Sequence, residues 1–246
     1  MKTILITGCS SGFGLETARY FLERDWNVIA TMRTPREDVL PRSDRLRILK
    51  LDVTDQASID AAVKEAGPID ALVNNAGIGW LNALEGTPMS LVREIFETNT
   101  FATMAMIQAF MPHFRAQQSG VIVNVTSSTT LMPLQLLSVY TASKAAVNAF
   151  TECFALELEP FNVRVRLVIP GYSPETQFGA NTQGRMGSGF PEPYLPMVQK
   201  VFEGLQGGGG PVTHSSDVAE AIWRAVTDPS APLRIPAGAD AVALSR

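Results

Sequence analysis

The sequence predicts an α/β fold in which helices cover both faces of a parallel, doubly wound sheet. Short apolar segments alternate with longer helical segments along the chain, as in repeated strand–helix–strand units. The first apolar segment ends in a glycine-rich turn, "TGCSSGFG", which opens a helix. Connections between parallel strands are right-handed, and this rule favours a doubly wound sheet.

Each element is then identified from its own residues. Apolar runs predict the strands, at 3–7, 27–32, 46–53, 69–77 with its loop, 120–127 and 163–171. Helical patterns predict the helices, at 12–24, 56–67, 90–115 and from Val139 to near Pro160. Strands alternating with helices of this length indicate a sheet covered on both faces.

One domain spanning residues 1–246 is expected, because no internal repeat or linker divides the chain. The 246 residues, 46% of them hydrophobic, are enough to bury one large core. A substrate loop is expected at about 172–210, where a Pro- and Gly-rich region precedes a run of four glycines.

Composition excludes several classes of function. The net charge of −4 provides no basic excess for nucleic acid, and no apolar run is long enough to span a membrane. The chain starts with a short β-branched run that fits a buried strand better than a signal peptide. The two cysteines, Cys9 and Cys153, fit a reducing cytoplasm better than a disulfide framework. The two histidines, His113 and His214, form no zinc-binding pattern, so no metal is expected.

The first strand–helix turn contains Gly8, Gly12 and Gly14. Such a turn is where a dinucleotide pyrophosphate binds, at the positive end of the helix dipole. The spacing is G-x-x-x-G-x-G, which differs from the commoner G-x-G-x-x-G, and a glycine-rich turn without a ligand is the alternative.

Two further strand ends border the same crevice. "NNAG", Asn74 to Gly77, either lines the crevice or merely completes a turn. Asp52 in "LDVT" either accepts a hydrogen bond from an adenine amino group or caps the next helix.

The helix "VYTASKAAVNAF" places Tyr140 and Lys144 one turn apart on one face. Lowering a phenol pKa from 10 to about 7 requires roughly 4 kcal/mol, and one nearby ammonium supplies about 3–4 kcal/mol. The pair can therefore handle a proton near neutral pH. An isolated Y-x-x-x-K is more often a packed tyrosine beside a solvated lysine, but Ser127 ends the preceding strand and faces the same crevice.

With these residues, the sequence resembles the short-chain dehydrogenase/reductase family along nearly its whole length. The matching elements are "TGCSSGFG", "LDVT", "NNAG", Asn99 in "ETNTFA", Ser127, "YTASK" and Pro170–Gly171. The resemblance implies a one-domain Rossmann fold with a seven-stranded parallel sheet, and hydride transfer between a nicotinamide cofactor and a carbonyl or alcohol.

The resemblance also implies roles for individual residues. Tyr140 is the general acid in reduction, Lys144 lowers its pKa and holds the nicotinamide ribose, Ser127 binds the substrate oxygen, and Asn99 anchors a water that relays protons. The expected cofactor contacts are Gly8, Ser10, Ser11, Gly12, Phe13, Gly14, Arg33, Asp52, Val53, Asn75, Ala76, Gly77, Tyr140, Lys144, Pro170 and Gly171.

The end of the second strand predicts NADP(H) as the cofactor. Proteins that prefer NAD usually place an acid there, whereas this chain has Met32 followed by Arg33. The Arg33 guanidinium suits a 2′-phosphate, and Ser11 could donate a further hydrogen bond to it. A solvated Arg33 without a ligand is the alternative.

The chain departs from the family pattern at two positions. Ala102 stands where glycine is common after the helix asparagine. Glu175 occupies the usual threonine position after Gly171, and Thr176 follows it, so the loop over the nicotinamide is expected to take a different path from that of the family.

The expected function is therefore a carbonyl reductase or ketoreductase. The alternatives are a hydroxysteroid or NAD-dependent alcohol dehydrogenase, and a non-catalytic protein that senses NADP(H).

The substrate is expected to be an apolar carbonyl or alcohol. The candidates for its pocket are Trp80, Leu131, Met132, Leu134, Phe178 and Met197. A homotetramer or homodimer is expected, because the helix at 90–115 and the catalytic helix, with Val147, Phe150, Phe154 and Leu158, carry more apolar surface than one sheet face needs.

Overall fold

The computed structural model describes residues 1–176, 182, 189–206 and 210–245. Within these residues the strands form one parallel sheet in the order β3-β2-β1-β4-β5-β6-β7. Its strands are β1 (Thr3–Ile6), β2 (Asn27–Met32), β3 (Leu46–Lys50), β4 (Ala71–Asn74), β5 (Gly120–Val125), β6 (Val163–Pro170) and β7 (Arg234–Ala237). The chain runs outward from β1 to β3 and then crosses back to β4, so the order reverses between β1 and β4. The predicted doubly wound α/β fold is confirmed.

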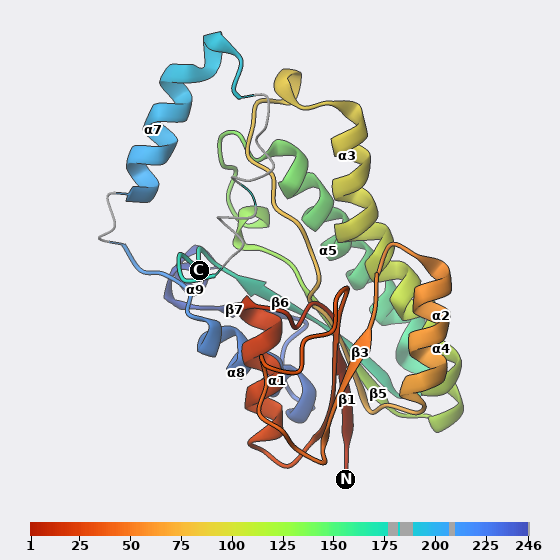
Figure 1. Ribbon diagram of the computed structural model, residues 1–246. Coiled ribbons are helices and arrows are strands. Elements are labelled where there is room, and N and C mark those ends of the chain that lie inside the picture. The colour runs from red at the N-terminus through yellow and green to blue at the C-terminus, as the bar shows by residue number, and fades with distance from the viewer. Residues whose placement is uncertain (177–181, 183–188, 207–209, 246) are drawn as a thin grey trace.

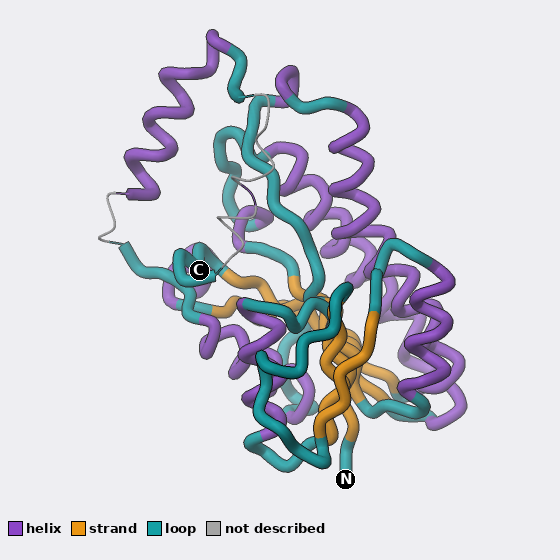
Figure 2. The backbone as a smooth tube through the Cα atoms, in the orientation of Figure 1, coloured by secondary structure: helices purple, strands orange, loops and turns teal. Residues whose placement is uncertain are grey.

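Helices lie on both faces of this sheet (Figures 1 and 2). On one face, α1 (Gly12–Leu22) and α8 (Ser215–Thr227) pack on alternate strand residues such as Ile4 and Ile6. On the other face, α2 (Gln56–Ala66), α4 (Ala102–Gln117) and α5 (Ser138–Leu158) pack on the intervening residues, such as Leu5. Both faces of each central strand are therefore buried, which is why these strands read as nearly continuous apolar runs.

The helix predicted at 90–115 is built from three segments. It comprises α3 (Met89–Phe96), a π-helical turn η2 (Glu97–Phe101) and α4. A π-turn inside a helix is frequently found at a functional site, and η2 contains Asn99.

Two strands are shorter than predicted: β3 ends at Lys50, and β4 spans only Ala71–Asn74. The polar residues that follow these strands belong to the loops at the carboxyl edge. The family resemblance implies a seventh strand without locating it, and the structure places it at β7, whose sequence "RIPA" is short and not purely apolar.

The remaining elements lie above this edge or beside it. They are α7 (Leu195–Gln206), α9 (Ala239–Leu244) and the 3-10 turns η1 (Leu84–Gly86), η3 (Ser128–Thr130), η4 (Glu159–Phe161) and η5 (Glu192–Tyr194). Helix α7 stands apart from the sheet (Figure 1), and its Val198 belongs to a small cluster with Leu81, Ala83 and Leu136. The predicted substrate loop at 172–210 lies partly outside the described residues.

Candidate active site

The candidate site lies at the carboxyl edge of β1, β4, β5 and β6, where the strand order reverses. In an open parallel sheet, loops diverge at such a point and leave a crevice for a ligand. The sequence-predicted site residues from the glycine loop, β4, β5, α5 and β6 all follow these strand ends or flank them.

Backbone geometry explains the glycines of the first loop. Gly8 and Gly12 have φ angles of 75° and 56°, in the left-handed region that favours glycine. A Cβ on Gly14 would lie 2.4 Å from the Gly8 carbonyl oxygen, so α1 begins too close to the loop for any side chain there. Ser11 is the N-cap of α1, and among the described atoms its side chain makes no capping hydrogen bond. Its hydroxyl is therefore available to a ligand at this helix end.

Asn75, the first residue after β4, supports the glycine loop. Its side-chain Nδ2 donates to the carbonyl oxygens of Thr7 and Gly8, at 2.9 and 3.3 Å. The Thr7 hydroxyl in turn accepts from the backbone amides of Asn75 and Ala76, each at 3.0 Å. The predicted cofactor residue Asn75 therefore shapes the loop, and Thr7, which the sequence reasoning missed, is its partner. The only signal for Thr7 was its place directly before Gly8.

The π-turn directs Asn99 at the loop after β4. Its Oδ1 accepts from the Ile78 amide at 2.8 Å, and its Nδ2 donates to the Ile78 carbonyl at 3.0 Å and to the Ser143 hydroxyl at 3.0 Å. A Cβ on Gly77 would lie 3.1 Å from Asn99 Oδ1 and 3.3 Å from Lys144 Nζ. Asn99, Gly77 and Lys144 thus meet at one point, and the absence of a side chain on Gly77 leaves space there.

Ser127 and Tyr140 form a hydrogen-bonded pair. Both side chains are buried, at 8% and 7% exposure. Burial raises the pKa of Tyr140 to about 12, and the hydrogen bond with Ser127 opposes that increase. Ser127 Oγ also accepts from the amide of Thr129 at 3.3 Å and lies 3.2 Å from its hydroxyl. This leaves the Ser127 proton directed at other acceptors.

Lys144 lies one turn after Tyr140 in α5 and is also buried, at 5% exposure. Its Nζ donates to the Val125 carbonyl at the end of β5, at 3.1 Å. Burial lowers the pKa of Lys144 to about 8. The prediction that Lys144 brings the Tyr140 pKa down to about 7 is not what the structure shows, because desolvation outweighs the other influences on the phenol.

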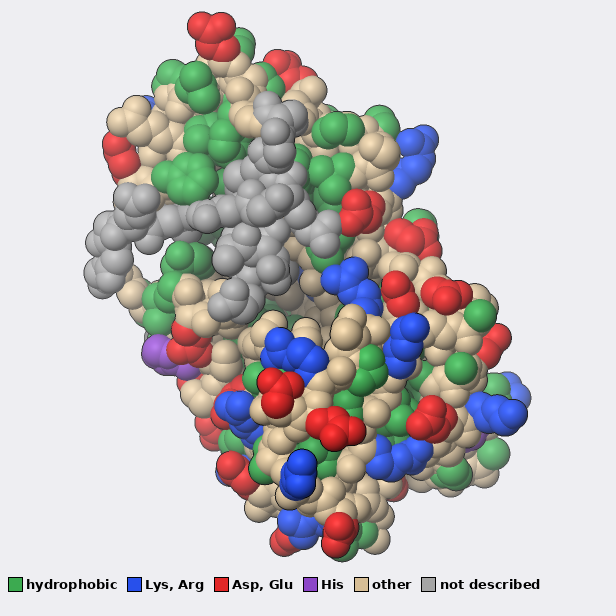
Figure 3. Space-filling model, viewed as in Figure 1, with side chains coloured by type: hydrophobic (Ala, Val, Ile, Leu, Met, Phe, Trp, Pro, Cys, Tyr) green, Lys and Arg blue, Asp and Glu red, His purple; other side chains and the backbone are tan. Residues whose placement is uncertain are grey.

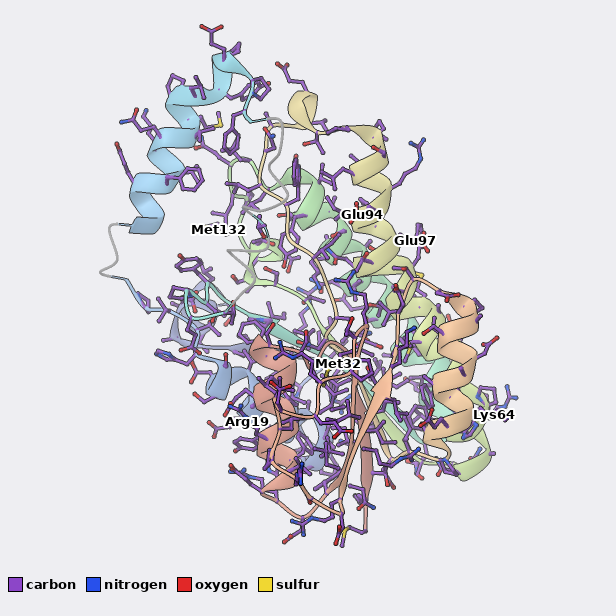
Figure 4. All side chains as sticks on the ribbon, viewed as in Figure 1. Arg19, Met32, Lys64, Glu94, Glu97 and Met132 are labelled. Carbon is purple, nitrogen blue, oxygen red and sulfur yellow. The ribbon has the colours of Figure 1, made fainter. Side chains whose placement is uncertain are left out.

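The end of β2 has the charge pattern expected for a phosphate site. Met32 is buried and Arg33 is exposed; Figure 4 labels Met32 near the middle of the molecule. Two hydrogen bonds from Thr54 lower the pKa of Asp52, and the positive charge of Arg33 adds to the decrease. Of the two readings of Asp52, helix capping is wrong, since Asp55 caps α2 through a 3.0 Å bond to the Ala57 amide.

Other predicted cofactor residues surround this core. Ser10 is exposed, Phe13 packs on the α1 face of the sheet, and Val53 packs on the opposite face. Pro170 ends β6, and its β7 partner is Ala237.

The segment after β6 is attached at several points. Glu175 accepts from the Ser215 amide at 2.6 Å and lies 3.3 Å from His214 Nδ1, so it holds the first turn of α8. The Thr176 side chain lies 3.5 Å from the position of a Cβ on Gly12. The departure from the family pattern therefore places Thr176 against the glycine loop.

The residues predicted to line an apolar pocket differ in how deeply they are buried. Trp80 is buried with Ile95 and Val139, and its Nε1 donates to Thr87 at 2.9 Å, so it belongs to the core. Met132 and Leu134 are each 42% exposed, and Leu131 and Met197 are partly buried; Figure 4 labels Met132 above the sheet. Phe178 lies outside the described residues.

Comparison with known proteins gives consistent matches. A family model described as short chain dehydrogenase matches residues 2–185. The uncharacterized oxidoreductase YusZ of Bacillus subtilis is 34% identical over 238 residues, which cover 92% of this chain and 85% of that protein.

No helix among the described residues is long and apolar enough to cross a membrane.

Solved structures match nearly the whole chain. A short-chain dehydrogenase from Streptomyces avermitilis is 31% identical with a TM-score of 0.83, covering 99% of this chain and 90% of that one. Serine dehydrogenase complexed with NADP+ is 27% identical with a TM-score of 0.81, covering 96% and 94%. A 3-ketoacyl-(acyl-carrier-protein) reductase from Brucella melitensis, complexed with NADH, is 27% identical with a TM-score of 0.79, covering 96% of each chain.

Proposed function

Because this chain belongs to the short-chain dehydrogenase/reductase family, an oxidoreductase family that uses NAD(P), we propose that it reduces a ketone or aldehyde to an alcohol, reversibly, with NADP(H). The observation that carries the proposal is the buried cluster of Ser127, Tyr140 and Lys144 beside Gly77 and Asn99. A protein that only sensed the cofactor would not need an ionisable phenol paired with a hydroxyl donor.

The described residues fit a nicotinamide dinucleotide. A pyrophosphate could bind at the N-terminus of α1, beside glycines whose backbone is in the left-handed conformation. The hydroxyl of Ser11, which makes no capping hydrogen bond, is available there as well. Lys144, whose Nζ lies 3.3 Å from the position of a Cβ on Gly77, would hold the ribose hydroxyls of the nicotinamide half. When bound, the cofactor supplies the hydride for reduction or accepts it in oxidation.

The chain's own residues handle the substrate oxygen and its proton. Ser127 donates a hydrogen bond to the carbonyl oxygen, since its own lone pairs face Thr129. Tyr140, whose raised pKa keeps it protonated at neutral pH, gives its proton to the oxygen as negative charge develops there. The Lys144 charge then stabilises the resulting phenolate.

We assign the cofactor preference to Arg33. Its exposed guanidinium follows the buried and uncharged Met32, and in this position it can pair bidentately with a 2′-phosphate. The Arg33 charge also contributes to the lowered pKa of Asp52, which follows the neighbouring strand β3.

An apolar substrate is the best fit to the rim of the site. Met132, Leu134 and Tyr172 are each more than two-fifths exposed there, at 42%, 42% and 46%. Figure 3 shows further hydrophobic side chains gathered where α7 lies. A bulky uncharged ketone would cover these surfaces, and charged substrates would leave them in water.

The test is NADPH oxidation with a panel of apolar ketones, using the unmodified protein and Tyr140→Phe. We expect turnover in the unmodified protein and a loss of about 100-fold or more in kcat for Tyr140→Phe, because the proton donor is removed. Cofactor binding, followed by quenching of tryptophan fluorescence, should change little. If Tyr140→Phe retained more than a few per cent of kcat, about 3% or more, another group would have to be the acid.

A further inference from the structure

The loop that leaves β6 is held by two residues from the C-terminal part of the chain. The Thr213 hydroxyl accepts from the Gly171 amide at 2.9 Å, and its one proton has two acceptors within reach, Asp240 Oδ1 at 2.6 Å and the Ala237 carbonyl at 2.9 Å. Asp240 Oδ2 accepts from the Tyr172 amide at 2.6 Å. The Tyr172 carbonyl accepts from the Thr213 amide at 2.8 Å. The Gly171 amide also donates to the Ala237 carbonyl at 3.3 Å. Both amides that follow Pro170 therefore donate to side chains of the Thr213–Asp240 pair.

Close packing supports the same connection. A Cβ on Gly171 would lie 2.0 Å from Asp240 Oδ2, so the carboxylate occupies the space where any other residue would have its side chain. A Cβ on Gly238, which has a φ of 92°, would lie 2.0 Å from Thr213 Oγ1. Because Gly171 and Gly238 have no side chains, Thr213 and Asp240 can contact the loop backbone directly.

The carboxylate of Asp240 is not used to cap its own helix. An acid in the first turn of a helix commonly bonds to that helix's free amides. Asp240 stands in the first turn of α9, yet the hydrogen bonds of its two oxygens go to Thr213 and Tyr172. Its position therefore serves the loop after β6.

This loop lies beside the reacting groups. Val168 in β6 pairs with Val125, whose carbonyl accepts from Lys144, and the Val168 carbonyl accepts from the Thr126 amide next to Ser127. From there the segment reaches Thr176, against the glycine loop. It therefore runs along the carboxyl edge from the Lys144 side of the site to the start of α1.

We propose that Thr213 and Asp240 are positioning residues, which hold the backbone of Gly171 and Tyr172 in the shape that the nicotinamide end of the cofactor requires. The inference rests on the proposed function, since it concerns the same cofactor site. It acts through the loop backbone and requires no contact between Asp240 and the cofactor.

The test compares Asp240→Asn with Asp217→Asn. Asp217 is a matched control, because it also lies in the first turn of a helix and accepts from a backbone amide, that of His214, at 2.8 Å. NADPH affinity is measured by fluorescence titration without substrate, together with the melting temperature and the KM for NADPH. We expect Asp240→Asn to weaken NADPH binding about ten-fold and to raise KM similarly. Asp217→Asn should lower the melting temperature by a comparable amount with unchanged affinity.

Two further variants test the geometry. Thr213→Val should reproduce the loss of affinity, and Thr213→Ser, which keeps the hydroxyl, should restore it. Gly171→Ala should also weaken binding, but the double variant Gly171→Ala/Asp240→Ala should bind NADPH no worse than Asp240→Ala alone, because the carboxylate that the new methyl group meets is gone.

The outcomes separate the two levels of the argument. If the unmodified protein bound neither NADPH nor NADH, the proposed function would fail and this inference with it. If NADPH bound equally well to the unmodified protein and Asp240→Asn, only the positioning role would be overturned. Equal losses of NADPH affinity in Asp240→Asn and Asp217→Asn would mean that Thr213 and Asp240 only stabilise the fold, and the inference would be overturned. It would also be overturned if the losses of NADPH affinity caused by Gly171→Ala and Asp240→Ala simply added in the double variant.

Discussion

At the scale of single residues, Lys144 combines a functional position with an electrostatic cost. Burial lowers its pKa from 10.5 to about 8, so the folded chain disfavours the ammonium relative to the unfolded chain. That cost is complete below pH 8, where both states carry the proton, and it disappears as pH rises from about 8 to 10.5. The same charge is what the proposed mechanism needs beside Tyr140.

We expect Lys144→Met to lose activity and to gain stability. At about pH 7 the free energy of unfolding should rise by roughly 1–3 kcal/mol, the avoided desolvation less the lost bond to Val125. The gain should shrink towards zero near pH 10.5, where the buried lysine is neutral in both states. Urea unfolding across this pH range measures it, with Lys64→Met on the exposed surface of α2 as the control (Figure 4). Unchanged or reduced stability at neutral pH would contradict this account of Lys144.

The proposed preference for NADP(H) rests on one residue, Arg33. With the unmodified protein, kcat/KM for NADPH should exceed that for NADH by about ten-fold or more, because a charge-assisted contact to phosphate contributes on the order of 1.5–3 kcal/mol. Arg33→Ala should remove most of this difference, and Arg36→Ala, a nearby exposed arginine, should leave it. Steady-state kinetics with both cofactors decides the matter. Equal or better efficiency with NADH in the unmodified protein would refute the preference.

At the scale of elements, the helix from α3 to α4 is joined to the β4 loop by Asn99. Asn99→Ala removes two partly buried hydrogen bonds to the Ile78 backbone and one buried hydrogen bond to Ser143. The free energy of unfolding should fall by about 2–3 kcal/mol, and activity should fall with it as Gly77 moves from Lys144. Chemical denaturation checks this, with Asn27→Ala as the control, since Asn27 makes one long side-chain bond of 3.5 Å. If Asn99→Ala lowered the free energy of unfolding no more than Asn27→Ala, the loop after β4 would be stable without the hydrogen bonds of Asn99.

The elements also show what the residues alone could predict. Apolar runs located the strands up to β6, and residue spacing placed Tyr140 and Lys144 on one helix face, because both patterns are local. The π-turn in the predicted helix at 90–115 could not be predicted, because the shift in helical phase that it produces is recognised only once α3 and α4 are seen to pack against different neighbours. The direction of the Tyr140 pKa shift depends on burial by distant segments. The contact of Asp240 with Tyr172 joins residues far apart in the sequence, where no spacing rule applies.

At the scale of the whole molecule, α5 presents an uncharged face to solvent. Val147 and Leu158, expected at an interface between copies, are buried in the core, and Phe150 and Phe154 pack partly against it. The exposed stripe is a different set at helical spacing, Ala142, Ala145, Ala149, Cys153 and Leu156, with exposed Glu157 at its C-terminal edge. Within this stripe Leu156 is the large apolar side chain, and it is 68% exposed. We therefore place the proposed dimer or tetramer contact on this stripe.

Assembly is tested by Ala149→Glu, which puts a charge in the middle of the stripe. The unmodified protein should sediment as a dimer or tetramer at micromolar concentration, and the variant should shift towards the 26.6 kDa monomer, because an unpaired carboxylate is costly to bury. Gln117→Glu, at the end of α4, adds the same charge away from the stripe. A lone 26.6 kDa species for the unmodified protein would end the proposal.

The π-turn between α3 and α4 has a consequence for insertions and deletions. Each residue added to or removed from an α-helix rotates everything beyond it by about 100°. Deleting Thr98 would let the segment 97–101 rewind as an ordinary helix, and α3 would turn by that angle relative to α4. Ile95, now fully buried with Trp80 and Val139, would swing away from them, and Asn99 would leave Ile78. One surplus residue thus keeps two helices in phase with two different neighbours, and this stretch should tolerate substitutions far better than changes in length.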